Sequence, residues 1–292
     1  MVPAAGMTMA KATVPPRPTA SPTAIPTPTA IPPMPIPRPR RMPMARAAAA
    51  GMPIRMADRP DPEAERNGSA PLLPLFTWLS PAFPVGGYAY SHALEWAVEA
   101  GDVTDEASLL AWLEDLLLLG FARGDAILLS LAHDACAQED GDALGEVNAL
   151  AVALAPSAEL RLETCQQGRS FLDAVLASWP HPRLSVLAAG FQGEVSYPVA
   201  VGVCAAAHGI GRRQVIPAFL LAVMQALVSA GLRLAPISQT AGLRILASLT
   251  PKIAALAAEI PDLGVADLGT ATFRADLGSF RHETQYTRLF RS

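Results

Sequence analysis

Apolar residues recur at helical spacing through most of the chain. In YAYSHALEWAVEAG (88–101), Tyr90, Leu94 and Val98 fall on one face of a helix, and Glu95 and Glu99 fall on another. Similar patterns follow in 105–121, 123–138, 142–154, 157–179, 214–232 and 238–260, while alternating β-branched runs are almost absent. We therefore predict an all-α, bundle-like single domain of about eight to ten helices over residues 71–280.

Proline and glycine mark the breaks between these segments. Pro84, Gly86 and Gly87 predict a structural turn ahead of the helix at 88–101. Thr104 is expected to cap the next helix, because two acidic residues follow it in the first turn. The run QVIPAFLLAVMQALVSAGL (214–232) is uncharged and about long enough for a membrane span of roughly 20 residues. Its proline and polar residues favour a buried core helix, with a membrane-associated protein as the alternative.

The first 70 residues differ in composition from the rest. They hold 16 of the 28 prolines, and residues 1–57 carry seven basic residues and no acidic one. We expect a disordered, basic tail on an acidic body, because dense proline removes backbone donors and few large apolar groups can be buried. A start at Met42, Met44, Met52 or Met56 is an alternative interpretation of this segment.

Residues able to support catalysis are few. The two lysines, Lys11 and Lys252, lie outside any phosphate-binding loop motif. The sequence HETQY near the end has tyrosine where the zinc-protease motif requires its second histidine. We therefore predict no catalytic residues, no stably bound cofactor and no role in nucleic-acid binding.

Two cysteine–histidine pairs have helical spacing, His133 with Cys136 and Cys204 with His208. A pair is not a site, because zinc takes at least three protein ligands, and we predict no metal site. The alternative is a helical metal-dependent hydrolase that combines such pairs with His282 or Glu283. Three cysteines far apart in the chain argue against a disulfide framework and favour a cytoplasmic protein.

Four segments together resemble the UreF family of urease accessory proteins. They are WLSPAFPVGGYAYSHALEWAVEAG (78–101), SYPVAVGVCAAAHG (196–209), LVSAGLRLAPISQTAGLRIL (227–246) and RHETQYTRLFRS (281–292). The resemblance covers residues 72–292 and implies an all-helical, dimeric scaffold that is not itself an enzyme. It further implies that the chain bridges a UreD-like (UreH-like) protein and the GTPase UreG, in an assembly that handles nickel for apo-urease.

The resemblance also implies roles for particular residues. The UreG-facing surface is expected to include Tyr88, Glu95, Arg233 and Gln239. His92-Ala93 stands where the family often has Gln-Gly, so this turn is expected to differ.

Residues 281–292 are expected to form a separate docking segment for the UreD-like partner. As a helix, this segment would align Tyr286, Leu289 and Phe290 in one apolar stripe, loosely packed until the partner binds. The candidate contact residues are Arg281, His282, Glu283, Gln285, Tyr286, Arg288, Leu289, Phe290 and Arg291.

Overall fold

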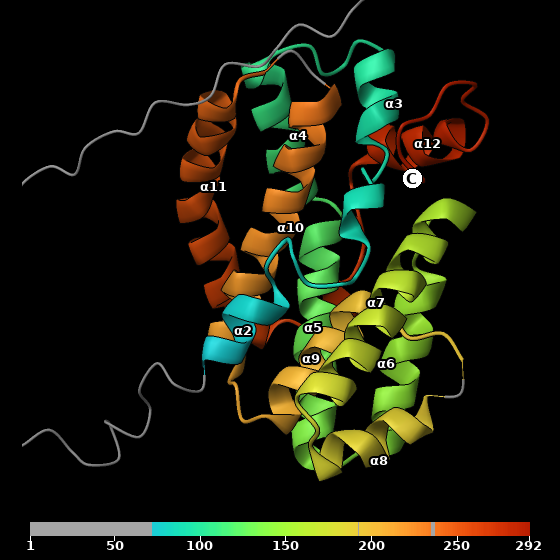
Figure 1. The fold of residues 1–292 in the computed structure, drawn as a ribbon, viewed down its shortest axis with the longest axis vertical. Coiled ribbons are helices and arrows are strands. Elements are labelled where there is room, and N and C mark those ends of the chain that lie inside the picture. The colour runs from blue at the N-terminus through green and yellow to red at the C-terminus, as the bar shows by residue number, and fades with distance from the viewer. Residues whose placement is uncertain (1–71, 192, 235–236) are drawn as a thin grey trace, which may run out of the picture. The chain divides into compact units, whose positions relative to one another are not determined.

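The protein is described by a computed structural model that covers residues 72–191, 193–234 and 237–292. These residues form helices without a strand, which confirms the predicted all-α class, and nine of the α-helices have nine or more residues (Figure 1). The predicted disordered tail, residues 1–70, lies outside the described residues. The α-helices are α2 (Leu73–Trp78), α3 (Leu94–Glu99), α4 (Glu106–Leu118), α5 (Phe121–Gln138), α6 (Gly141–Ala153), α7 (Ala158–Ser178), α8 (Pro182–Gly190), α9 (Tyr197–Ala207), α10 (Arg212–Leu234), α11 (Gln239–Glu259) and α12 (Phe273–His282). Three single 3₁₀ turns lie at Gly87–Ala89 (η2), Ile260–Asp262 (η3) and Val265–Asp267 (η4).

Helix α9 lies in the core of the bundle. Nearly all its side chains are buried, and it packs against α5 on one side and α7 on the other (Figure 1). Two glycines permit this close packing. A Cβ atom on Gly202 would lie 2.4 Å from the carbonyl oxygen of Leu129 in α5, and one on Gly168 in α7 would lie 2.2 Å from that of Val195. The small residues of SYPVAVGVCAAAHG therefore serve helix packing.

The segment predicted as one helix at 88–101 is broken in the structure. After the turn η2, the backbone of His92 and Ala93 has φ of 53° and 63°, in the left-handed region that L-residues seldom adopt. The helix α3 then begins at Leu94 and has six residues. The apolar periodicity continues through this segment, but it could not reveal the change of backbone conformation at positions 92 and 93.

The start of α4 also differs from the prediction by one residue. Asp105, rather than Thr104, is the N-cap, and its carboxylate accepts a hydrogen bond of 2.9 Å from the backbone N–H of Ser108. The Ser108 hydroxyl in turn accepts one from the Asp105 N–H, which completes a capping box.

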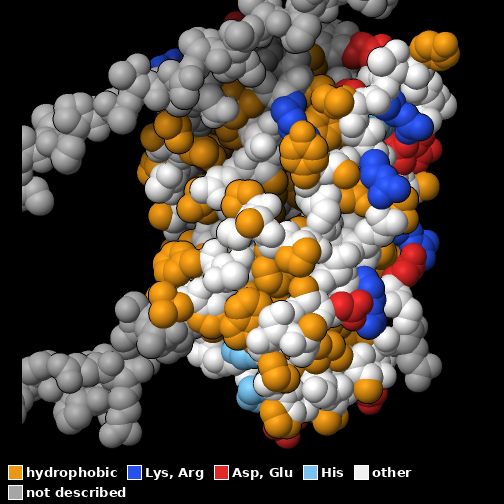
Figure 2. Space-filling model, in the orientation of Figure 1, with side chains coloured by type: hydrophobic (Ala, Val, Ile, Leu, Met, Phe, Trp, Pro, Cys, Tyr) orange, Lys and Arg blue, Asp and Glu red, His pale blue; other side chains and the backbone are white. Residues whose placement is uncertain are grey.

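Helix α10 contains the uncharged run and packs against α11, α5 and α3. By length and composition, α10, α11 and the α4–α5 segment are each apolar enough to cross a membrane, although half of the α10 window is buried inside the bundle. Large apolar side chains also remain exposed at the surface, among them Leu73 and Phe76 on α2 and Leu243 on α11. Figure 2 shows hydrophobic side chains spread over the face that carries α2 and α11, whereas charged side chains gather at the opposite edge of the view.

Candidate functional site

The C-terminal segment, residues 281–292, packs onto α3, α7 and α10 rather than forming a free helix. Helix α12 ends at His282, and the residues beyond it are turns and extended chain. The predicted stripe is therefore wrong: Phe290 is only 4% exposed, whereas Leu289 is 62% exposed and Tyr286 is fully exposed. The expectation of loose packing is likewise not met, because a set of buried polar contacts fixes this segment.

Glu95 holds the segment from the first turn of α3. Its side chain is 7% exposed, and its two carboxylate oxygens accept the backbone N–H groups of Leu289 at 2.6 Å and Phe290 at 2.9 Å. The Glu95 carboxylate was predicted to face a partner, but it makes its hydrogen bonds within the molecule. Any role of Glu95 in binding a partner is therefore indirect. Glu99, one turn later, is exposed.

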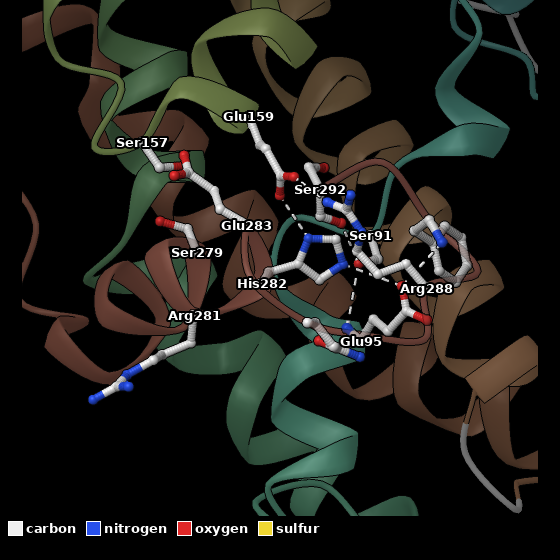
Figure 3. A network of polar contacts seen from close by, with 12 residues as sticks. Ser91, Glu95, Ser157, Glu159, Ser279, Arg281, His282, Glu283, Arg288 and Ser292 are labelled. Carbon is white, nitrogen blue, oxygen red and sulfur yellow. Dashed lines mark hydrogen bonds and ion pairs between the residues drawn. The ribbon is translucent and has the colours of Figure 1, made fainter. Parts of the chain in front are cut away.

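His282 links two carboxylates at the end of α12. Its ring is completely buried, with Nε2 3.1 Å from Glu95 Oε2 and Nδ1 2.6 Å from Glu159 Oε2 on α7 (Figure 3). The imidazole ring thus lies between two carboxyl groups, one at each ring nitrogen. Arg288 forms an ion pair with the other oxygen of Glu159. Glu95, Glu159, His282 and Arg288 therefore form one polar cluster, which is buried at His282 and reaches the surface at Arg288.

The last residues of the chain are bound to the segment that precedes α3. The Ser292 carbonyl accepts hydrogen bonds from Ser91, at 3.1 Å from its backbone N–H and 2.5 Å from its hydroxyl. The backbone N–H of Arg291 donates to the Ala89 carbonyl at 2.9 Å, and the Ser292 hydroxyl donates to Glu163 at 2.5 Å. Residues about 200 positions apart in the sequence are thereby joined.

Tyr88 and Arg233, two of the predicted UreG-facing residues, lie in contact with the same segment. The Arg233 guanidinium donates to the Tyr88 carbonyl at 2.8 Å and lies 3.9 Å from the centre of the Tyr88 ring. It also lies 4.3 Å from the centre of the Phe290 ring. Tyr88 is 77% exposed, so this cation–π stack reaches the surface. Residues predicted as two separate sites thus form one arrangement.

The other candidate residues occupy varied positions around this stack. Gln239 is the exposed first residue of α11, and none of the contacts above involves it. Arg281 is exposed and points away from the buried cluster in Figure 3. Glu283 accepts the N–H of Ala158 at the start of α7, at 3.0 Å, and the Gln285 side chain donates to the Thr287 carbonyl.

In the predicted turn, Gly86 has φ of 73° and requires glycine, whereas Pro84 is exposed and Gly87 begins η2.

The alternative metal site gains no support from the geometry. Cys204 is fully buried in α9, and burial raises the pKa of its thiol. His208 faces the carbonyls of Cys204 and Trp179, while His282 is engaged by the two glutamates. Within the described part of the chain, no group of three histidine, cysteine or acidic residues is placed to hold a metal ion.

Sequence reasoning missed Glu159, Ser91, Glu163 and Ser292. Glu159 lies in the first turn of α7, where the helix dipole alone explains an acidic residue. Its contact with His282 spans 123 residues, so no local pattern in the sequence could have revealed it.

Known proteins resemble this chain over most of its length. The family model for UreF matches residues 103–250. The urease accessory protein UreF of Xanthobacter autotrophicus is 68% identical over 228 residues, which are 78% of this chain and 94% of the relative. That of Azorhizobium caulinodans is 66% identical over 229 residues, 78% of this chain and 99% of the relative. The family match and these identities show that the chain belongs to the UreF family of urease accessory proteins.

Proposed function

We propose that this chain is a non-enzymatic scaffold that bridges a UreD/UreH-like protein and the GTPase UreG during urease maturation. Its membership of the UreF family supports the role in maturation. The Tyr88–Arg233–Phe290 stack carries the finer proposal, because it joins an exposed aromatic–arginine pair to the C-terminal segment. Arginine and tyrosine are among the residues that dominate the energetics of protein interfaces.

The UreG-facing surface in this proposal is centred on Tyr88 and Arg233. The guanidinium is planar and partly exposed, so a partner carboxylate can approach the side that does not face the rings. Glu95 and His282 act as positioning residues, because they hold Phe290 beneath the guanidinium without themselves reaching the surface.

The UreD-like partner binds the exposed side of the C-terminal region. Tyr286 and Leu289 project from the pinned segment, and α12 adds Phe273, Leu277 and Phe280 at helical spacing. These large exposed apolar side chains need a partner to be removed from water. An already ordered segment also binds at a lower cost in conformational entropy than a disordered one.

The scaffold works as a cytoplasmic homodimer within an assembly that also holds apo-urease. Nickel is the cargo of that assembly, and it enters the urease site in a step coupled to GTP hydrolysis by UreG. The scaffold supports or gates this step through the partners it holds. The lack of a phosphate-binding loop in the sequence fits this division of labour, since the nucleotide chemistry then belongs to UreG.

Co-purification of the full chain with co-expressed UreD-like protein and UreG tests the proposal. Arg233→Ala should lower UreG recovery about 10-fold, corresponding to a loss of roughly 1.4 kcal/mol, because it removes the stacked cation. Arg213→Ala is the matched control, since Arg213 is an exposed arginine near the start of the same helix. A wild-type chain that retains neither partner, or equal losses in the two variants, would contradict the proposal.

A further inference from the structure

A pocket lies between α6 and α8, apart from the candidate site. Figure 1 shows α8 at the lower end of the helices, whereas α12 and the chain end lie at the upper end. The empty volume of the pocket is about 1000 Å³, including the part open to solvent. Its apolar lining residues are Leu144 on α6, Val186 and Leu187 on α8, and Phe191. Val186 is 74% exposed, so the described residues cover this apolar lining only in part.

Glycines leave room in this pocket. A Cβ atom on Gly141, Gly145 or Gly190, which all line it, would meet no described atom within 4 Å. Gly202 in α9 differs, because there the backbone of α5 excludes a side chain. Gly145 lies in the interior of α6, where glycine is unfavourable relative to alanine. Packing among the described residues therefore does not explain Gly145, whereas the close approach of another backbone would.

The surface beside the pocket is acidic. Glu139, Asp140, Asp142 and Glu146 lie at the end of α5 and in α6, and all four are exposed. The Asp140 carboxylate caps α6, and the helix dipole favours an acidic residue at Asp142 in the first turn. Neither reason applies to Glu146, which lies beyond that turn. The excess of negative charge is therefore larger than the helix start requires.

Arg183, the basic residue that lines the pocket, offsets only part of this charge. Its guanidinium donates to the Cys136 carbonyl and lies 3.8 Å from the Glu139 carboxylate. Arg183 is thus engaged at the Glu139 end of the pocket. The apolar lining is therefore bordered by net negative charge on the side of Asp142 and Glu146.

We propose that this pocket binds a basic amphipathic helix of another protein. Apolar side chains of that helix contact Leu144, Val186 and Leu187, while its lysines or arginines lie beside Asp142 and Glu146. A helix suits the site because the α8 residues that line it fall three or four positions apart, on one face. The inference does not rest on the proposed function, since the pocket contains none of the residues assigned to UreG or the UreD-like partner.

The charge of the site decides against other occupants. Nucleic acid and anionic lipid surfaces are repelled by the exposed carboxylates. The body of a second copy is also a poor partner, because residues 58–292 carry 26 acidic and 15 basic residues. A basic segment of a different protein supplies both the missing charge and the missing apolar cover.

A fluorescence anisotropy titration of the full chain tests the inference. The probe is a labelled peptide of about 15 residues, with leucine and lysine placed at the spacing of an amphipathic helix. We expect saturable binding with a Kd of about 10 μM, which weakens as salt is added. Two control peptides carry serine in place of leucine or glutamate in place of lysine. Each control should bind at least about 10-fold more weakly, because it lacks one of the two contacts.

Two pairs of variants locate the binding site. Asp142→Asn combined with Glu146→Gln should weaken binding of the leucine–lysine peptide about 10-fold. The matched control, Glu99→Gln combined with Glu259→Gln, removes two exposed carboxylates on α3 and α11 and should leave the affinity unchanged. Val186→Ser should likewise weaken binding, whereas Val265→Ser, at an exposed valine outside the pocket, should not. Circular dichroism of each variant confirms that the fold is intact.

Several outcomes would overturn the inference. Equal binding of the serine peptide would remove the apolar lining from the site, and equal binding of the glutamate peptide would remove its charge. The same loss in both carboxylate pairs would mean that the peptide binds the acidic surface as a whole. If the peptide does not bind while the maturation partners still co-purify, this inference fails and the proposed function stands.

Discussion

Single residues stabilise this protein through the polar contacts that they make with the C-terminal region. Glu95 and Glu159 each contact a basic side chain from the C-terminal region, His282 and Arg288 respectively. Such a cluster adds little net stability over an apolar one, because desolvation offsets much of the attraction. Removing one member is costly, however, since its partners then remain buried and unpaired.

Glu95→Gln should lower the free energy of unfolding by about 3 kcal/mol, because a neutral amide weakens the buried contact with His282 and turns an N–H group toward the donors of Leu289 and Phe290. Urea denaturation followed by circular dichroism measures this loss. Glu99→Gln, on the exposed side of α3, should stay within about 0.5 kcal/mol of wild type. Equal stability of the two variants would show that the Glu95 contacts are energetically neutral.

Asp125 should make stability depend on pH in an unusual direction for a carboxyl group. Its pKa in the folded state, about 7, lies above the ordinary value of 3.8, so the folded state binds more protons than the unfolded state between these limits. The free energy of unfolding therefore falls as pH rises from about 4 to 7, by up to roughly 4 kcal/mol for this group.

Asp125→Asn should remove that dependence. The variant should match the wild type near pH 4 and exceed it in stability at pH 8, as measured by urea midpoints across this range. A wild type that is as stable as Asp125→Asn at pH 8 would mean that the carboxyl ionises without cost.

At the level of elements, helices α9 and α3 are held in place by different kinds of contact. Helix α9 is fixed by close packing through glycines, whereas the short α3 depends on partners far away in sequence. The two left-handed residues before α3, His92 and Ala93, are unfavourable for L-residues and persist because both ends of the turn are anchored.

Gly202→Ala should lower the free energy of unfolding by about 2 kcal/mol or more, because the new methyl group would meet the Leu129 carbonyl and separate α9 from α5. Gly145→Ala is the matched control in α6, where nothing lies within 4 Å, and it should gain about 0.5–1 kcal/mol from helix propensity. Thermal unfolding of both variants checks the contrast. A stabilised Gly202→Ala variant would show that α9 and α5 can move apart without loss.

Helices held by a repeated local pattern could be predicted from the sequence, whereas contacts between distant residues could not. Periodicity found the long helices, because a buried face of a long helix repeats many times. It failed at 88–101, where the left-handed turn leaves no apolar signature, and at the chain end, where Phe290 is buried by tertiary contacts. Tyr88 and Arg233 were reached through family resemblance. Glu159 could not be reached at all, since its role depends on a side chain that only folding brings near.

In the described part of the molecule as a whole, the C-terminal segment links α3, α7 and α10 through its contacts. It contributes a buried ring, two cations and several backbone hydrogen bonds to elements that otherwise meet only in part. The surface proposed for partners is therefore built by the global fold and not by one helix.

Deletion of residues 283–292 should leave most helical content in place but lower the free energy of unfolding by at least about 3 kcal/mol, because Glu95 loses its backbone donors and the buried Phe290 ring is removed. The same deletion should abolish retention of the UreD-like partner. Tyr286→Ala separates the two effects, since this side chain is fully exposed: stability should stay within about 0.5 kcal/mol while partner retention falls. Retention by the deleted chain would contradict the docking role.

The hydrogen bonds between Ser91 and Ser292 have a consequence for how the chain folds during its synthesis. Synthesis runs from the N-terminus, and domains generally fold as units while the chain is made. The hydrogen bonds that hold the segment before α3 need residues made some 200 positions later, so a nascent chain carries Glu95 and Glu159 without their contacts to His282 and Arg288. Chains cut short before residue 283 cannot assemble the Tyr88–Arg233–Phe290 stack. Under the proposed function, such shortened chains would therefore lack the surface assigned to UreG.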